Sequence, residues 1–291
     1  MITRKQSRMT PGRIVSVAFM VAALALGCWA FIWEPSSFVT RTHRVAIPHW
    51  RAELAGLRVA VLGDLHVGSP YSGLSKLAEI VDATNRLQPD LILLPGDFVI
   101  QEVLGGKFVS PEDASAVLAR LKAPLGVWAV LGNHDWWLDE KRVQAALEQH
   151  GIRVLEDRAV VIKRGDAQFW LVGISDFWEG AHDVRAATSA IHDDAPVLMF
   201  THNPDVFPTI ANRFSLLVAA HTHGGQVHLP LLGRPIVPSA YGERYAIGHV
   251  VENGRHLFVS SGLGTSIIPV RFRVPPEISV LELVPIEQPG S

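Results

Sequence analysis

The sequence predicts a layered α/β domain preceded by one N-terminal transmembrane helix. Short apolar runs bounded by Gly, Pro and Asp are typical of buried strands. Five such runs occupy residues 57–62, 91–94, 127–131, 197–200 and 216–220. Stretches with helical patterning separate several of them, and this alternation is typical of layered α/β domains.

Four parts of the chain follow in order. Residues 1–13 form a basic segment, residues 14–33 an apolar span, residues 34–55 a lead-in, and residues 56–291 the domain. The span carries no charge, and as a helix it would be roughly 30 Å long, which matches one bilayer core. Trp29 and Trp33 lie toward its far end, where interfacial aromatic residues are common.

The charges around this span predict its orientation. Four basic residues precede it without any acid: Arg4, Lys5, Arg8 and Arg13. Because positive residues stay in the cytoplasm, we expect a single-pass protein of the bacterial inner membrane with its domain on the outer side. A cleaved signal sequence ending near Ala25 and lipidation at Cys28 are the alternatives to an uncleaved anchor.

The remaining elements are expected in the following order. Residues 39–48 are an edge strand or extended lead-in, residues 74–87 have an apolar helical face, Pro111 opens a second helix, and residues 140–150 form a third. Strands are expected at 153–155, 159–163, 168–172 and 256–259, and short helices at 183–191 and 204–211. The alternating residues 269–276 are expected to be an edge strand or a surface that faces lipid headgroups.

Side chains able to bind metal follow each of the five apolar runs. They are Asp64, His66, Asp97, Asn133, His202, His221 and His223. One ion does not need seven protein ligands, whereas two ions about 3.5–4 Å apart with a shared carboxylate do. Since every donor is nitrogen or oxygen, the pattern favours an open catalytic site for two divalent ions, either Mn, Zn or Fe. The His-x-His pair can serve one ion or both.

These motifs resemble those of the calcineurin-like metallophosphoesterases, whose pattern is D-x-H, G-D, G-N-H-D/E, H and G-H-x-H. The resemblance runs from about Gly56 to Leu283 and is closest to the YkuE/YaeI-like membrane-associated phosphodiesterase branch. It implies two mixed sheets packed as a sandwich with helices outside. Two positions depart from the pattern: Ala220 stands where a Gly usually precedes His-x-His, and Ile100 stands where many relatives carry another Asp.

The resemblance also implies a role for each residue. Asp64, His66 and His223 would bind the first metal, Asp97 would bridge both metals, and Asn133, His202 and His221 would bind the second. His134 would be a general acid near the leaving group, with Asp135 orienting it. Candidate substrate contacts are Trp136, Trp137, Gly224 and Gly225.

We therefore expect a hydrolase in which metal-bound hydroxide attacks a phosphodiester or pyrophosphate bond. The phosphoester substrate could be lipid-linked. A UDP-2,3-diacylglucosamine-type lipid pyrophosphatase is an alternative, although that substrate is cytoplasmic. A catalytically inactive metal-binding scaffold is another, and the intact His134 argues against it.

Composition argues against nucleic-acid binding and excludes a disulfide within the chain. The net charge is −2, and it becomes −6 without the four N-terminal basic residues. An acidic domain is a poor nucleic-acid binder, so we expect no nucleic-acid partner and do not favour a nuclease. Cys28 is the single cysteine, so no disulfide can form within the chain.

Overall fold

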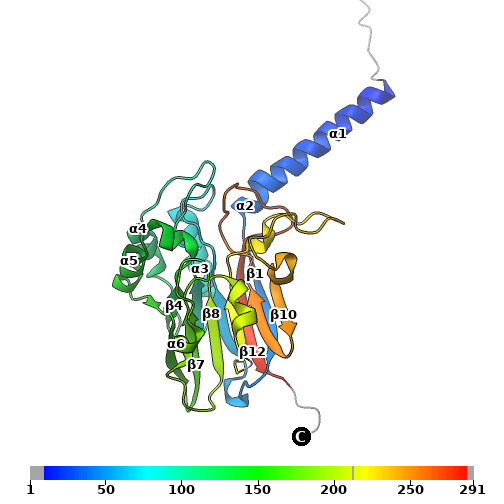
Figure 1. Ribbon diagram of the computed structural model, residues 1–291. Coiled ribbons are helices and arrows are strands. Elements are labelled where there is room, and N and C mark those ends of the chain that lie inside the picture. Colours follow the sequence, from blue (N-terminus) through cyan, green and yellow to red (C-terminus); the bar gives the residue numbers. More distant parts are fainter. Residues whose placement is uncertain (1–9, 212, 287–291) are drawn as a thin grey trace, which may run out of the picture.

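The computed structural model describes residues 10–211 and 213–286, and its domain is built on two six-stranded mixed sheets (Figure 1). The first sheet has the order β1-β12-β2-β3-β4-β5. Its strands are β1 (Val39–Ile47), β2 (Leu57–Val61), β3 (Leu91–Pro95), β4 (Val127–Val130), β5 (Arg153–Val154) and β12 (Glu277–Pro285). Strands β2 to β5 run parallel, and β12 runs antiparallel to β2.

The second sheet has the order β10-β11-β9-β8-β7-β6. Its strands are β6 (Arg158–Arg164), β7 (Ala167–Ile174), β8 (Val197–Thr201), β9 (Leu216–Ala219), β10 (Gly248–Glu252) and β11 (Arg255–Val259). Strands β7, β8, β9 and β11 run parallel, while β6 and β10 pair antiparallel at the two edges.

Three apolar layers hold the sheets and helices together. Side chains of both sheets meet in the middle layer, where Trp128, Phe169 and Phe200 are buried. The outer face of the first sheet packs on α3 (Leu74–Arg86), α4 (Pro111–Leu118) and α5 (Asn133–Gln149). The outer face of the second sheet is covered by α6 (Val184–Thr188) and a 3₁₀ turn at Pro204–Thr209. Both expected sheets and the sandwich are thus confirmed.

The N-terminal helix leaves one end of the domain (Figure 1). It consists of α1 (Pro11–Cys28), a π-helical turn at Trp29–Trp33 and α2 (Glu34–Ser36). An 18-residue stretch of this 26-residue helix has a mean hydropathy of 2.3 and is almost wholly exposed, so by length and composition the helix can cross a membrane. The basic residues Arg4, Lys5 and Arg8 lie outside the described residues.

The local expectations hold in part. The helix expected at 140–150 is confirmed as the second part of α5, which has a kink at Asp139. A first part, which the sequence analysis missed, begins at Asn133, because Gly132 ends β4 and the Asp135 carboxylate caps the first turn by accepting the Gly132 N–H. Residues 269–276 are not a strand; the segment is a loop with one isolated bridge, between Val227 and Phe272. The edge strand expected at 39–48 is confirmed as β1, which lies at the edge of the first sheet and pairs with β12 across its whole length.

Candidate metal centre

The candidate ligands gather where five parallel strands of both sheets end. Strand β2 leads to Asp64 and His66, β3 to Asp97, β4 to Asn133, β8 to His202, and β9 to His221 and His223. All seven residues are buried, with exposed fractions of 5% or less. The structure therefore brings together every ligand candidate that the sequence suggested, at the edge of the sandwich where ligands of α/β sheets bind.

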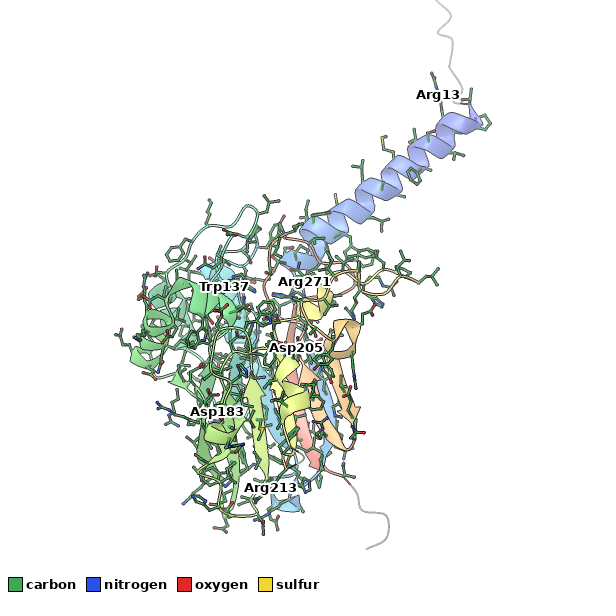
Figure 2. All side chains as sticks on the ribbon, in the orientation of Figure 1. Arg13, Trp137, Asp183, Asp205, Arg213 and Arg271 are labelled. Carbon is green, nitrogen blue, oxygen red and sulfur yellow. The ribbon has the colours of Figure 1, made fainter. Side chains whose placement is uncertain are left out.

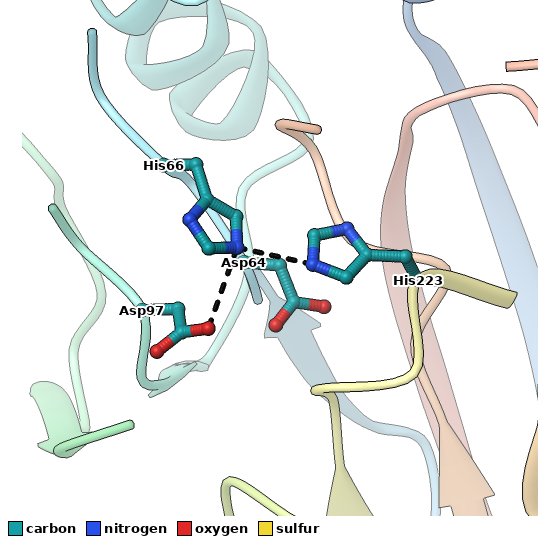
Figure 3. Close-up of side chains that lie close together, drawn as sticks. All are labelled: Asp64, His66, Asp97 and His223. Carbon is teal, nitrogen blue, oxygen red and sulfur yellow. Dashed lines mark hydrogen bonds and ion pairs between the residues drawn. The ribbon is translucent and has the colours of Figure 1, made fainter. Parts of the chain in front are cut away.

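The ligand atoms form two groups that share one carboxylate. Asp64, His66, Asp97 and His223 have ligand atoms within 4.8 Å of one another (Figure 3), and Asp97, His202 and His221 form a second group. In the first group the Nε2 atoms of His66 and His223 are 3.0 Å apart. In the second, His202 Nε2 lies 3.0 Å from His221 Nδ1 and 3.1 Å from Asn133 Oδ1, so Asn133 belongs to this group.

Hydrogen bonding fixes which atoms face the centre. His66 Nδ1 lies 3.2 Å from the Val99 carbonyl, and His202 Nδ1 lies 2.8 Å from the Pro95 carbonyl. A carbonyl can only accept, so each Nδ1 carries a proton and each Nε2 is the ring nitrogen that faces the centre. Both Nε2 atoms lie 3.3 Å from Asp97 Oδ2, which is also an electron-pair donor. Electron-pair donors that converge in this way favour a positive charge between them, either a metal ion or a proton.

The pKa shifts also indicate that the centre favours a bound positive charge. Burial lowers the pKa of His66 to about 3 and holds the pKa values of His221 and His223 well below the ordinary range. Neutral imidazole is the form that binds metal. Burial also disfavours the charged form of His202, yet the carboxylates of Asp97 and Asp64 raise its pKa to about 10. A proton on His202 thus takes the place that a metal ion would fill.

Two further observations fit a metal at this centre. Three buried side-chain atoms of the candidate ligands have no hydrogen-bond partner among the described residues, namely Asp64 Oδ2, His221 Nε2 and His223 Nδ1. The backbone is also in the left-handed region at five of the seven candidates: Asp64, His66, Asp97, His221 and His223. Such conformations persist for non-glycine residues where the surroundings force them, which is common at functional sites.

His134 lies next to the ligands but is not grouped with them. Its ring stands edge-on to His66 at 4.7 Å between centroids, and its backbone N–H donates to Asp97 Oδ1 at 3.0 Å. Burial lowers the pKa of His134, with Asp97 opposing the effect. An anionic phosphoester beside the ring would oppose it further, because a nearby negative charge favours imidazolium.

Asp135 is hydrogen-bonded to the backbone around Asp97. Its carboxylate accepts hydrogen bonds from the backbone N–H groups of Gly132, Asp97, Phe98 and Val99 at 2.8–3.3 Å. These amides occupy both of its oxygens, and no hydrogen bond joins it to the His134 ring within the described chain. Asp135 therefore fixes the Asp97 loop, and its expected role in orienting His134 stays a prediction.

Indole rings border the centre on the solvent side. Trp137 is half exposed, packs at 4.9 Å on the His134 ring, and donates its indole N–H to Glu179 at 2.7 Å. Trp178 stands edge-on to His221 at 4.4 Å. Trp136 instead packs against the helical layer beside the first sheet. Of the two adjacent indoles, only Trp137 lies beside the catalytic candidates.

The two departures from the family pattern have simple structural consequences. The methyl group of Ala220 lies over Gly63, where an added side-chain carbon would come within 2.6 Å of it. The missing side chain of Gly63 thus makes room for Ala220 at the strand end. Ile100 is buried in the loop after β3, against Gly68 and Gly106.

The candidate substrate contacts Gly224 and Gly225 lie in a tight turn after the His-x-His motif. Gly224 and Gly225 have φ values of 59° and 71°, and Arg234 donates to the Gly224 carbonyl.

One buried cation near the centre was missed by the sequence analysis. Arg271 is fully buried and donates to the carbonyls of Gly264 and Val274. Burial lowers its pKa to about 10, opposed by Asp64 and Glu34. Nothing in the sequence marks this arginine, because its hydrogen-bond partners are backbone carbonyls.

The fold and the shared-carboxylate centre define a metal-dependent phosphoester hydrolase. The model of the calcineurin-like phosphoesterase family matches residues 57–225, and the chain belongs to this family. It is 33% identical to the phosphodiesterase YaeI of Escherichia coli over 86% of this chain and 90% of that protein. It is 28% identical to the uncharacterized metallophosphoesterase YkuE of Bacillus subtilis over 91% and 94% of the two chains.

A more distant relative carries a name that includes a membrane segment. The chain is 29% identical to a Danio rerio "transmembrane protein with metallophosphoesterase domain", over 79% of this chain and 54% of that protein. The shared region is thus about half of the vertebrate protein, whereas the two bacterial relatives match over nearly their whole lengths.

The packing of Gly63 against Ala220 yields a double-mutant prediction. Gly63→Ala should destabilise the protein by about 1–3 kcal/mol, because two methyl groups would compete for one space at a strand end. Ala220→Gly should restore part of this loss, although Pro95 Cγ would remain 3.2 Å from the new methyl group. Urea unfolding of the full chain in detergent measures the coupling.

Gly73→Ala is the control, since nothing lies within 4 Å of its added carbon. Strictly additive effects of Gly63→Ala and Ala220→Gly would contradict the contact.

Proposed function

We propose that the protein is a membrane-anchored phosphoesterase that uses two divalent metal ions to hydrolyse a phosphodiester or pyrophosphate bond. The observation that carries the proposal is the pair of buried ligand groups that share Asp97. The naming of the E. coli relative as a phosphodiesterase supports the diester substrate. Nitrogen and oxygen donors favour Mn, Zn or Fe.

Two bound cations would lower the pKa of water and neutralise charge on the phosphoryl oxygens. Asp64, His66 and His223 would hold one ion, Asn133, His202 and His221 the other, and Asp97 both. The protein's own contribution is to fix these groups: the Val99 and Pro95 carbonyls set the tautomers of His66 and His202. Asp135 holds the loop that carries Asp97. His134 would donate a proton to the leaving oxygen.

Asp97→Asn tests the shared-carboxylate assignment. An amide lacks the negative charge that holds two cations, so we expect the variant to lose metal from both sites and to lose activity. Elemental analysis of the full chain after metal loading measures the metal content. The fully exposed Asp194→Asn is the matched control and should behave as wild type. Retention of two tightly bound ions by Asp97→Asn would rule out a bridging role.

His134→Ala separates an enzyme from an inactive scaffold. The variant should keep its metal, because His134 is assigned outside the ligand groups, and it should lose roughly 10²–10⁴ in turnover, the usual share of a general acid. The loss should be smallest for p-nitrophenyl esters and largest for alkyl or sugar esters, whose alkoxides are too basic to leave unprotonated.

The measurement is turnover of both proteins across leaving groups of differing pKa, with metal content as the control. An equal loss for all leaving groups would indicate charge stabilisation in place of proton transfer. Absence of turnover in the metal-loaded wild type on diesters, monoesters, cyclic nucleotides and UDP-lipids would favour the scaffold.

We also propose that the helix anchors the protein in the bacterial inner membrane with the domain outside the cytoplasm. The support is the excess of basic residues before Ile14. Alkaline phosphatase fused after Ser291 should therefore be active in cells. An active cytoplasmic reporter and an inactive phosphatase would reverse this topology, and would favour the UDP-2,3-diacylglucosamine-type pyrophosphatase.

A further inference from the structure

The most exposed apolar side chains of the domain gather in three loops. Among the described residues after Ser36, the six most exposed large apolar side chains are Leu104, Phe108, Leu231, Leu232, Ile236 and Ile267, at 58–105% exposure. They belong to the loops 100–110, 226–241 and 261–276, which we call the apolar collar. Exposed apolar patches of this kind mark interaction sites.

The collar surrounds the place where the helix meets the domain (Figure 1). The Arg271 N–H donates to the Ala30 carbonyl at 2.9 Å, and the rings of Trp29 and Phe272 pack at 5.3 Å. The collar loops are also bonded to one another, since Leu104 N–H donates to the Ile267 carbonyl and His228 N–H to the Phe272 carbonyl. Helix end and collar therefore form one continuous structure.

The length of the helix sets the level of the collar relative to a membrane. The uncharged residues 14–33 span roughly 30 Å as a helix, which is the thickness of the hydrocarbon core. Trp29 and Ala30 belong to the last turns of this span, and they contact Phe272 and Arg271. If the helix crosses a bilayer, the loop 261–276 must lie at the boundary between acyl chains and headgroups.

The charge of the collar suits an anionic lipid surface. The loops 226–241 and 261–276 contain no acidic residue, and Glu102 is the single acid of the loop 100–110. Exposed Lys107 and Arg273 and half-buried Arg234 lie among the apolar residues. The rest of the domain is acidic, so this concentration of positive charge is local, and basic residues near anionic headgroups are attracted to them.

The collar also leads directly into the metal centre. Gln226 follows the His221–His223 motif by three residues and exchanges hydrogen bonds with the Ser266 backbone. Gly264 N–H donates to the Asp64 carbonyl at 2.6 Å. Lys107 N–H donates to the carbonyl of Gly68, two residues after His66. Figure 2 shows Trp137 and Arg271 at the end of the domain from which the helix leaves.

We propose that the apolar collar inserts into the bilayer crossed by the N-terminal helix and holds the mouth of the metal centre at the headgroups, so that the enzyme draws a phosphoester of a membrane lipid from that bilayer. The seating of the collar is independent of catalysis, whereas the choice of a lipid phosphoester rests on the proposed function. The single native cysteine, Cys28, makes the seating simple to test.

In a Cys28→Ser background, single cysteines replace Leu104, Leu231, Ile236 and Ile267 in the full chain. Each is labelled with an environment-sensitive fluorophore and reconstituted in vesicles of phosphatidylethanolamine and phosphatidylglycerol. Spin-labelled lipids should quench these probes several-fold more than probes at Val161 and Val251, which are exposed apolar residues on β6 and β10. Equal quenching at collar and control positions would overturn the seating.

A matched pair of substrates tests the second part. Bis-p-nitrophenyl phosphate is soluble, and the p-nitrophenyl ester of phosphatidic acid carries the same leaving group in a vesicle. The double variant Leu231→Glu, Leu232→Glu should keep the soluble rate and lose about tenfold or more on the lipid ester, because two apolar side chains no longer enter the bilayer. Val251→Glu should leave both rates unchanged.

The outcomes separate the two proposals. Equal rates of the double variant and wild type on the lipid ester would overturn the lipid substrate while the soluble rate still supported the phosphoesterase. A metal-loaded wild-type protein without activity on either ester, but with quenched collar probes, would overturn the proposed phosphodiester hydrolysis and leave the seating supported.

Discussion

The position of the Asp97 carboxylate is the constraint on which the rest of the centre depends. One oxygen, Oδ2, lies 3.3 Å from the Nε2 atoms of both His66 and His202, and the other accepts the N–H of His134. These partners come from strands of two different sheets. Each sheet alone supplies only part of the ligand residues. Both sheets of the sandwich are therefore needed to bring the two ligand groups to one carboxylate.

This carboxylate is held by backbone geometry that the surrounding core must enforce. Asp97 has a φ of 58°, and its N–H donates to the buried Asp135, which also accepts from Gly132, Phe98 and Val99. A carboxylate that accepts several amides keeps two strand ends, those of β3 and β4, at a fixed separation. Gly132 has no side chain because an added carbon would lie 2.3 Å from Asp97 Oδ1. Each residue of the Gly-Asn-His-Asp motif thus has its own role. The glycine allows the close approach to Asp97, the asparagine is a ligand candidate, the histidine is a catalytic candidate, and the aspartate anchors the loop that carries Asp97.

The sequence predicted those parts of the structure whose pattern lies within a few consecutive residues. Apolar runs ending in Asp, Asn or His located β2, β3, β4, β8 and β9 and every ligand candidate, because strand and ligand are adjacent in the chain. Strand β10 and strand β12 were missed, although residues 277–280 alternate between polar and apolar side chains. Arg271 could not be found at all, since its surroundings arise only when the loop 261–276 folds against the helix end.

The contacts of Arg271 give the anchor helix more than a tethering role. Its backbone N–H donates to the Ala30 carbonyl, its side chain donates to the Gly264 carbonyl, and the Gly264 N–H donates to the carbonyl of Asp64. Glu34 at the end of the helix accepts the N–H of Val274. A buried arginine without hydrogen-bond partners would be strongly destabilising. Moving the contacted carbonyls away from Arg271 would therefore cost free energy, and this keeps them in place. The last turns of the helix therefore belong to the framework that positions Asp64, and the membrane-facing end of the molecule and its metal centre are one packed unit.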